Sequence, residues 1–427
     1  MGVFLLQNQA NLLPTLFVGV GFQQPGVVSH LGGQRRGNVK FFQNGLPQGA
    51  IHLRRRAKIG PAVLAAHMGD VPPEAAVHKT TVINQAVGPD GVHIGIFGYS
   101  DVKGAYFEAV SGWFRTHFGW ETKPEWLVKT PGVVYALAMA VRALTKPGDG
   151  ILIQPPVYYP FFSVILDNDR KIVESPLVYE NGRYTIDFAD FERKIVEQDV
   201  RLFLLCSPHN PVGRVWTAEE LRRIGDICRR HNVYVVSDEI HCDFAFPEHP
   251  HHIFLKAVPE MAGQAIVCTA PSKTFNLAGL QTSNIFIPSA ALRARFQKEI
   301  DRTGYSQLNM MGLIACQAAY ENGGGWLEEC RAYLRGNLEY LRAFLQERLP
   351  QVKLVEPEGT YFAWLDCSGL DLCRRELNDL IVNRARLWLD AGHLFGQNAG
   401  QFQRIVLACP RVVLAQALEQ LEQAVNG

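Results

Sequence analysis

The stretch Thr269-Ala270-Pro271-Ser272-Lys273-Thr274-Phe275-Asn276 is the part of the chain from which the rest of the fold is predicted. The apolar run Ala265-Ile266-Val267-Cys268 before it is typical of a buried strand that ends at Pro271. A lone lysine then follows among small and apolar neighbours. A lysine amine condenses with aldehydes, and removal from water makes it lose its proton readily. On this stretch alone, a strand-end lysine that reaches for water is the better interpretation.

Two further strand ends change that interpretation. The run Val233–Glu239 has a buried-strand pattern that ends in an acid, Asp238. The run Leu204–Gly213 reads as a strand followed by a turn that presents Asn210. An asparagine, an aspartate and a lysine in this order are what a pyridoxal 5′-phosphate site requires. The lysine bonds the cofactor covalently, the acid pairs with the pyridine nitrogen, and the amide bonds the ring hydroxyl.

Three ordered motifs carry a family resemblance: Asn210-Pro211-Val212-Gly213, Ser237-Asp238-Glu239-Ile240-His241 and Ala270–Asn276. Together they resemble the class I/II aminotransferase fold, and more closely its cystathionine β-lyase branch, the MalY/PatB-type carbon–sulfur lyases. The resemblance extends from about His93 to the end of the chain. It implies an α/β, aspartate aminotransferase-like fold, with a mainly parallel sheet in a large domain (residues 93–310) and a smaller α+β domain (residues 311–427).

A predicted anion site precedes these motifs. A strand over Trp126–Lys129 leads into the turn Pro131-Gly132, and apolar periodicity predicts a helix from Val133 to Leu144. The free N–H groups and the dipole at a helix N-terminus attract a phosphate. By resemblance, the cofactor phosphate receives backbone N–H groups from Gly132, Val133 and Val134, and a hydroxyl from Ser272.

The resemblance adds residues from other parts of the chain. Tyr158 stacks on the cofactor ring, and Tyr99 reaches the phosphate from a neighbouring subunit, which implies a homodimer. Arg404 clamps the substrate carboxylate with its bidentate fork. Without the resemblance, an arginine in a surface ion pair would be the simpler interpretation, and the family usually has Asn where this chain has Val406.

The motif that ends in His241 bears on the reaction type. Ordinary transaminases of this fold commonly carry Asp-x-x-Tyr where this chain has Asp238-Glu239-Ile240-His241. The histidine fits the lyase branch, although it could equally be a structural residue. The resemblance implies a carbon–sulfur β-lyase that cleaves L-cystathionine or related cysteine S-conjugates to a thiol, pyruvate and ammonia. Two alternatives stay open: an aminotransferase of the same fold, and a catalytically impaired protein with a binding or regulatory role.

Residues 1–92 do not match the family pattern and have an unusual composition. They hold eight Lys or Arg but three acids, and no Asp or Glu occurs before Asp70. Three interpretations compete: a divergent N-terminal domain, a basic surface for an acidic partner, and a segment translated out of frame. The third is favoured, because glycine and glutamine interrupt the periodicity of every would-be helix.

Composition sets outer bounds on function. The chain has 427 residues, 47% hydrophobic and 19% charged, with a net charge of +1, which describes a soluble globular protein and gives no reason to expect nucleic-acid or membrane binding. Nine cysteines without a Cys-x-x-Cys pair favour neither a disulfide framework nor a metal site, and fit the cytoplasm. We expect no signal peptide.

The segment Glu248–His252 is predicted to form a surface loop. Further elements are predicted as a capped helix from Thr217 to about His231, a strand over Thr360–Asp366 and a helix over Val412–Val425.

Overall fold

The computed structural model describes residue 102 and residues 104–427, all of which belong to one compact unit. The segment 1–92, Tyr99 and the start of the family resemblance at His93 lie outside the described residues. The division into two domains at residue 311 stays a prediction. None of the helices in the described part of the chain is both long and apolar enough to cross a bilayer.

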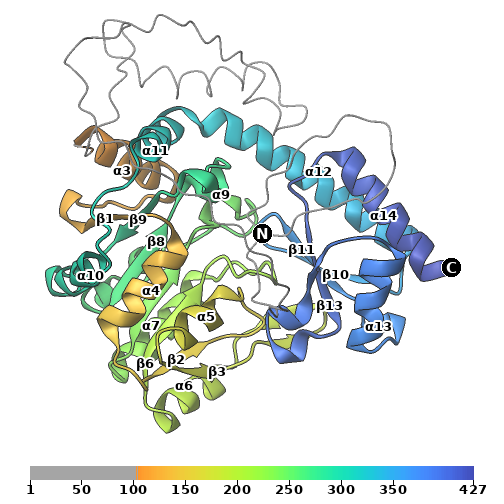
Figure 1. Ribbon diagram of the computed structural model, residues 1–427, viewed down its shortest axis with the longest axis horizontal. Coiled ribbons are helices and arrows are strands. Elements are labelled where there is room, and N and C mark those ends of the chain that lie inside the picture. The colour runs from red at the N-terminus through yellow and green to blue at the C-terminus, as the bar shows by residue number, and fades with distance from the viewer. Residues whose placement is uncertain (1–101, 103) are drawn as a thin grey trace, which may run out of the picture. The chain divides into compact units, whose positions relative to one another are not determined.

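Two main sheets and a hairpin are built from short strands (Figure 1). The seven-stranded sheet contains β1 (Leu127–Thr130), β2 (Gly150–Ile153), β3 (Lys171–Glu174), β6 (Val200–Cys206), β7 (Tyr234–Asp238), β8 (Ala265–Thr269) and β9 (Ser283–Phe286). The four-stranded sheet contains β10 (Lys353–Val355), β11 (Phe362–Asp366), β12 (Asp390–Ala391) and β13 (Phe402–Val406), and the hairpin pairs β4 (Val178–Glu180) with β5 (Arg183–Thr185).

Helices alternate with these strands. In chain order they are α3 (Gly104–Phe118), α4 (Val133–Leu144), α5 (Pro160–Leu166), α6 (Phe188–Glu197), α7 (Ala218–Arg230), α8 (Phe254–Ala257), α9 (Pro271–Thr274), α10 (Ala290–Arg302), α11 (Met310–Asn322), α12 (Gly324–Arg348), α13 (Arg374–Asp379) and α14 (Arg411–Asn426). Figure 1 shows the long α12 leading from the side of the larger sheet to that of the smaller one, where α13 and α14 lie.

The larger sheet is mainly parallel, as the sequence predicts. Its strand order is β1-β9-β8-β7-β6-β2-β3, and only β9 runs against both of its neighbours. The parallel run places the carboxyl ends of β6, β7 and β8 side by side, with Asp238 opposite Cys206 and Cys268 in the register. Residues that follow these three strands therefore meet at one edge of the sheet.

Both faces of this sheet are buried. Alternate residues project to opposite faces of a strand, so Ile151 and Ile153 pack with residues of α4, α5 and α10, whereas Leu152 packs in the core on the other face. Each fully buried side chain of this size contributes about 1.5–3 kcal/mol relative to an exposed one. Helices on both faces keep the strands in place and leave the edge at the carboxyl ends for ligands.

The predicted elements are found with small differences at their ends. The helix predicted from Val133 to Leu144 is α4, and a capping box between Thr217 and Glu220 begins α7. The strand predicted from Thr360 begins only at Phe362, because Thr360 has a left-handed backbone with φ of 71°. Likewise β8 ends at Thr269, and the lysine lies in the short helix α9 after it.

Candidate active site

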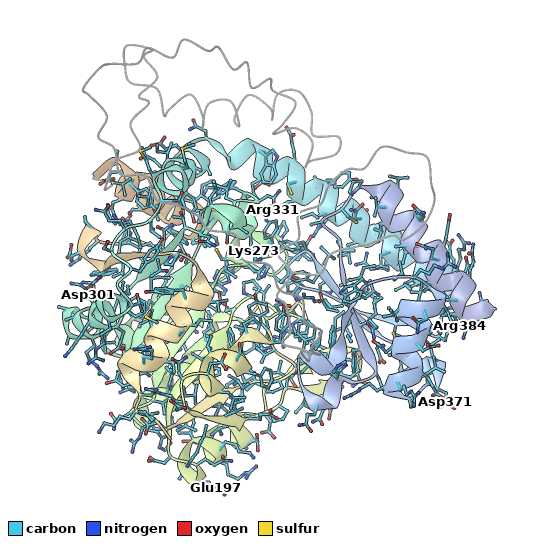
Figure 2. The ribbon with its side chains drawn as sticks, viewed as in Figure 1. Glu197, Lys273, Asp301, Arg331, Asp371 and Arg384 are labelled. Atoms are coloured by element: carbon cyan, nitrogen blue, oxygen red, sulfur yellow. The ribbon has the colours of Figure 1, made fainter. Side chains whose placement is uncertain are left out.

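Three strand-end residues meet as the sequence predicts. Asn210 lies in the turn after β6, Asp238 is the last residue of β7, and Lys273 lies in α9, just after β8. Figure 2 labels Lys273 beside α9, between the larger sheet and the strands β11 and β13. The site therefore lies where the two sheets approach each other.

Asp238 is a buried carboxylate. It is 3% exposed, and its Oδ1 accepts a bond from the backbone N–H of Ile240 at 3.2 Å. Burial raises the pKa of Asp238 to about 7, and the neighbouring Glu239 adds to the rise, although Lys273 opposes it. A cation held next to this carboxylate would return it to its ionised form.

Lys273 is in the opposite situation. Burial lowers the pKa of its amine from the usual range, and the positive charge of Arg404 lowers it further, while Asp238 opposes the change. A lowered pKa provides more of the neutral amine, which is the form that attacks a carbonyl or accepts a proton.

Arg404 is buried and held by two neighbouring side chains, and its ion pair does not lie on the surface. It lies on β13 with its side chain 1% exposed. Its Nε and Nη2 donate to Asp390 Oδ2 at 3.1 and 2.6 Å, and its Nη1 donates to Asn210 Oδ1 at 2.7 Å. The rings of Phe362 and Phe395 lie 4.0 and 4.7 Å from the guanidinium carbon. The bonds to described residues leave one N–H on each terminal nitrogen, and two such groups can bind a carboxylate.

The predicted ring-stacking residue lies close to this arginine. Burial raises the pKa of Tyr158 well above its usual range, and the charges of Tyr159 and Asp238 raise it further, whereas Arg404 lowers it. The Tyr158 ring packs against Tyr159 at 5.3 Å and Phe161 at 6.3 Å between ring centroids. The tyrosine therefore stays neutral and presents an aromatic wall.

The predicted anion site has open space before it. Gly132 adopts φ of 151° as the residue before α4, and a Cβ built on it would meet no atom of the described residues within 4 Å. The Ala136 N–H bonds Gly132 O, so the N–H groups of Val133 and Val134 precede the first intrahelical bond. Ser272 is half-buried in α9 next to the lysine.

His241 is buried beside the same cations. Burial lowers the pKa of His241 well below its usual range, and the charges of Lys273 and Arg404 lower it further. Its ring packs edge-on against Tyr361 and Phe362, with ring centroids 5.3 and 5.5 Å apart. The Nδ1 atom has no hydrogen-bond partner in the described part of the chain. His241 is thus a neutral group in the wall of the site.

A buried network that the motifs did not predict holds the lysine helix. Thr274 Oγ1 donates to Asp243 Oδ2 at 2.6 Å, and Trp113 Nε1 donates to Asp243 Oδ1 at 2.9 Å. Asp243 lies just beyond the Ser237–His241 motif, so the network joins the segments that carry Asp238 and Lys273. Its only sequence signal is a threonine next to the lysine and an acid near the aspartate.

The loop Glu248–His252 is not entirely a surface loop, and that prediction is wrong for His251. The His251 side chain is 1% exposed, and its Nε2 lies 2.8 Å from Glu239 Oε2. A buried acid distant in sequence draws this histidine inward, which loop composition does not reveal. Within residues 102 and 104–427, no group of three or more His, Cys, Asp or Glu side chains could hold a metal ion.

The family model for aminotransferase class I and II matches residues 73–421. The chain belongs to the class I and II aminotransferase family. This family match begins within the segment 1–92, which the motifs leave unmatched. Among curated relatives, this aminotransferase-family chain is 41% identical to cystathionine β-lyase PatB of Bacillus subtilis (strain 168), over 332 residues that cover 78% of this chain and 86% of the relative.

Solved structures of the same fold are also similar to this aminotransferase-family chain. Cystalysin from Treponema denticola, which contains a pyridoxal 5′-phosphate cofactor, has a TM-score of 0.78 and 36% identity, covering 84% of this chain and 88% of its own. The pyridoxal phosphate-bound C–S lyase from Staphylococcus hominis has a TM-score of 0.76 and 34% identity, covering 83% and 90% of the two chains. The predicted family and the aspartate aminotransferase-like fold are confirmed.

The observed groups fit a pyridoxal phosphate. The carboxyl group of Asp238 has a raised pKa that a protonated ring nitrogen would reverse. The open space at Gly132 leaves room for a phosphate at the N-terminus of α4. The amine of Lys273 has the lowered pKa that attack on an aldehyde needs.

The raised pKa of Asp238 predicts how the stability of the cofactor-free protein depends on pH. An unfolded aspartate loses its proton near pH 4, whereas buried Asp238 keeps it to about pH 7. The folded state therefore binds more protons in this window, and its stability decreases as the pH rises through it. Compared with the wild type, Asp238→Asn should be more stable at pH 8, by on the order of a few kcal/mol, and about equally stable at pH 4.

Urea unfolding of the cofactor-free protein at both pH values measures this difference. Asp226→Asn, at a side chain that is 60% exposed on α7, is the control and should change neither value appreciably. An equal effect of Asp238→Asn at pH 4 and pH 8 contradicts the prediction.

Proposed function

We propose that this protein is a pyridoxal 5′-phosphate-dependent carbon–sulfur β-lyase, acting on L-cystathionine or related cysteine S-conjugates. The observation that carries the proposal is the arrangement around Arg404. The buried Arg404 keeps N–H groups that can bind a carboxylate. It lies in the same site as Lys273, whose pKa is lowered, and the buried Asp238. The names of the relatives, a cystathionine β-lyase and a C–S lyase, favour elimination as the reaction of this site.

Four residues of the chain would hold the cofactor through different chemistry. Lys273 would attach it, Asp238 would keep the proton on the pyridine nitrogen, Asn210 would bond the ring hydroxyl, and Tyr158 would cover the ring face. Its phosphate would lie at the N-terminus of α4, by Gly132, Val133, Val134 and the hydroxyl of Ser272. When bound, pyridoxal 5′-phosphate supplies an electron sink for the bonds at the substrate α-carbon.

The remaining steps belong to the side chains. The fork of Arg404 would bind the substrate carboxylate end-on, because Asp390 already occupies the Nε side of the guanidinium. The rings of Phe362 and Phe395 pack against that guanidinium, whose side chain is buried. The Nζ of Lys273, with its lowered pKa, would remove the proton from the α-carbon. His241 would line the site as a neutral wall.

The assembly and its location are part of the same proposal. By family resemblance, Tyr99 would complete the phosphate site of a second copy, so the working unit would be a homodimer. All nine cysteines are free thiols, and eight of them are buried or half-buried groups that need no oxidant. This favours the cytoplasm.

The reaction type is tested with L-cystathionine and no added keto acid. We expect homocysteine, pyruvate and ammonia in equal amounts, because a thiolate leaves readily from the β-carbon. Arg404→Lys should reduce kcat/KM by roughly 10–100-fold, since lysine cannot form the two-point clamp. Arg411→Lys, at an arginine whose Nε bonds Asn337 Oδ1, is the matched control and should be near wild type.

Two other outcomes have clear meanings. Stoichiometric transfer of the amino group to an added keto acid, without ammonia, would make this protein an aminotransferase. Cofactor binding without turnover of either kind would support a binding or regulatory role.

The dimer is tested by mixing two inactive variants. A Tyr99→Ala chain and a Lys273→Ala chain should rebuild one intact site in each mixed dimer, because each supplies what the other lacks. Activity should return to a sizeable fraction of the wild-type value per intact site. A mixture of Lys273→Ala with Asp238→Ala chains is the control and should stay inactive, because both residues act within one chain. No recovery in verified mixed dimers would show that Tyr99 is not shared between subunits.

A further inference from the structure

A second buried acid lies directly behind Asp238. Glu239 is 0% exposed and follows Asp238 at the end of β7. Consecutive residues of a strand project to opposite faces of the sheet. The hydrogen bonds of Glu239 to Phe254 and His251 agree with this and direct its side chain toward α8 and the Glu248–His252 loop.

Three donors hold this carboxylate. Ser237 Oγ and the backbone N–H of Phe254 both donate to Glu239 Oε1 at 2.9 Å, and His251 Nε2 lies 2.8 Å from Oε2. These three donors satisfy both oxygens of the buried side chain. A carboxylate is costly to bury, so its position behind Asp238 calls for an explanation.

The geometry of His251 indicates which ring nitrogen bonds to Glu239. Its Nε2 meets the carboxylate, while its Nδ1 has no hydrogen-bond partner among the described residues, and the Phe118 ring lies 5.7 Å away, edge to face. A proton on Nε2 satisfies this arrangement, whereas an Nδ1–H would have no acceptor among the described residues. His251 therefore donates from Nε2 to Glu239.

The side chains around the two acids include one amine and several thiols. Asp238 faces Lys273 in the site and the thiols of Cys206 and Cys268 on the neighbouring strands. The thiols of Cys242 and Cys268 also lie within the electrostatic reach of Glu239, and the pKa of each is raised, chiefly by burial. These buried thiols are neutral, so the field of Glu239 reaches Asp238 with little screening.

We propose that Glu239, held in place by His251, is a positioning residue that strengthens the grip of Asp238 on the protonated ring nitrogen of the cofactor. The inference rests on the proposed function, because it needs a cationic ring nitrogen at Asp238. The second charge makes Asp238 costly to ionise alone and increases its attraction for a cation. The histidine-rich loop thereby acquires a role at the site without touching it.

The test measures cofactor binding and ring protonation, both independent of turnover. In Glu239→Gln, the dissociation constant for pyridoxal 5′-phosphate, obtained by titrating cofactor-free protein, should increase by roughly tenfold. The pH at which the ring nitrogen loses its proton, followed by ¹⁵N NMR of labelled cofactor in the holoenzyme, should fall by about one unit. The glutamine can still accept the bonds from Ser237 and Phe254.

Three further variants separate charge from structure. His251→Gln keeps a donor for Glu239 and hence the charge, so both quantities should stay at wild-type values even if the melting temperature falls. The double variant Glu239→Gln/His251→Gln keeps an amide–amide bond without charge, and should repeat the Glu239→Gln shifts if the single variant folds poorly. Glu192→Gln removes the acid of an exposed pair in which His231 Nε2 lies 2.8 Å from Glu192 Oε1, and should change nothing.

The outcomes distinguish this inference from the function on which it rests. Wild-type affinity and ring titration in Glu239→Gln, or equal shifts in His251→Gln, would overturn the role of the charge and leave the proposed function intact. A wild-type chain that binds no pyridoxal 5′-phosphate would overturn both.

Discussion

The burial of a negative charge at the end of β7 is the constraint on which the site depends. Asp238 lies between two thiol-bearing strands, with a pKa raised to about 7 by burial and by Glu239. A carboxylate in this position is stable only as the neutral acid or beside a cation. The folded protein therefore favours a positively charged group beside Asp238, and a protonated pyridine nitrogen is such a group.

Lys273 lies at the same edge of the sheet, and its pKa is shifted in the opposite direction. Burial and the charge of Arg404 lower the pKa of Lys273, so the lysine tends to be neutral where the aspartate tends to be protonated. Arg404 in turn forms an ion pair with Asp390 and donates a hydrogen bond to Asn210. Burial shifts the pKa values of Asp238 and Lys273 in opposite directions, and the parallel strand order brings these two residues to one place.

Local patterns predicted the elements and the motif residues, but not the partners that fix them. Apolar periodicity gave the ends of α4, and the three motifs gave Asn210, Asp238 and Lys273. The Arg404–Asp390 pair depends on the register between β12 and β13, and the burial of His251 depends on Glu239. These contacts join segments that no short window contains, and a polar loop looks the same in sequence whether or not one of its side chains turns inward.

The lysine to which the cofactor attaches covalently can be identified chemically. Borohydride reduction of the holoprotein, followed by peptide mapping, should place the reduced cofactor on Lys273 alone, and Lys273→Ala should carry no label. This result is expected because the amine of Lys273 lies in the site with Asp238 and Arg404, and because burial, together with the charge of Arg404, lowers its pKa. A label on a different lysine, or a reduced holoprotein without any label, would contradict it.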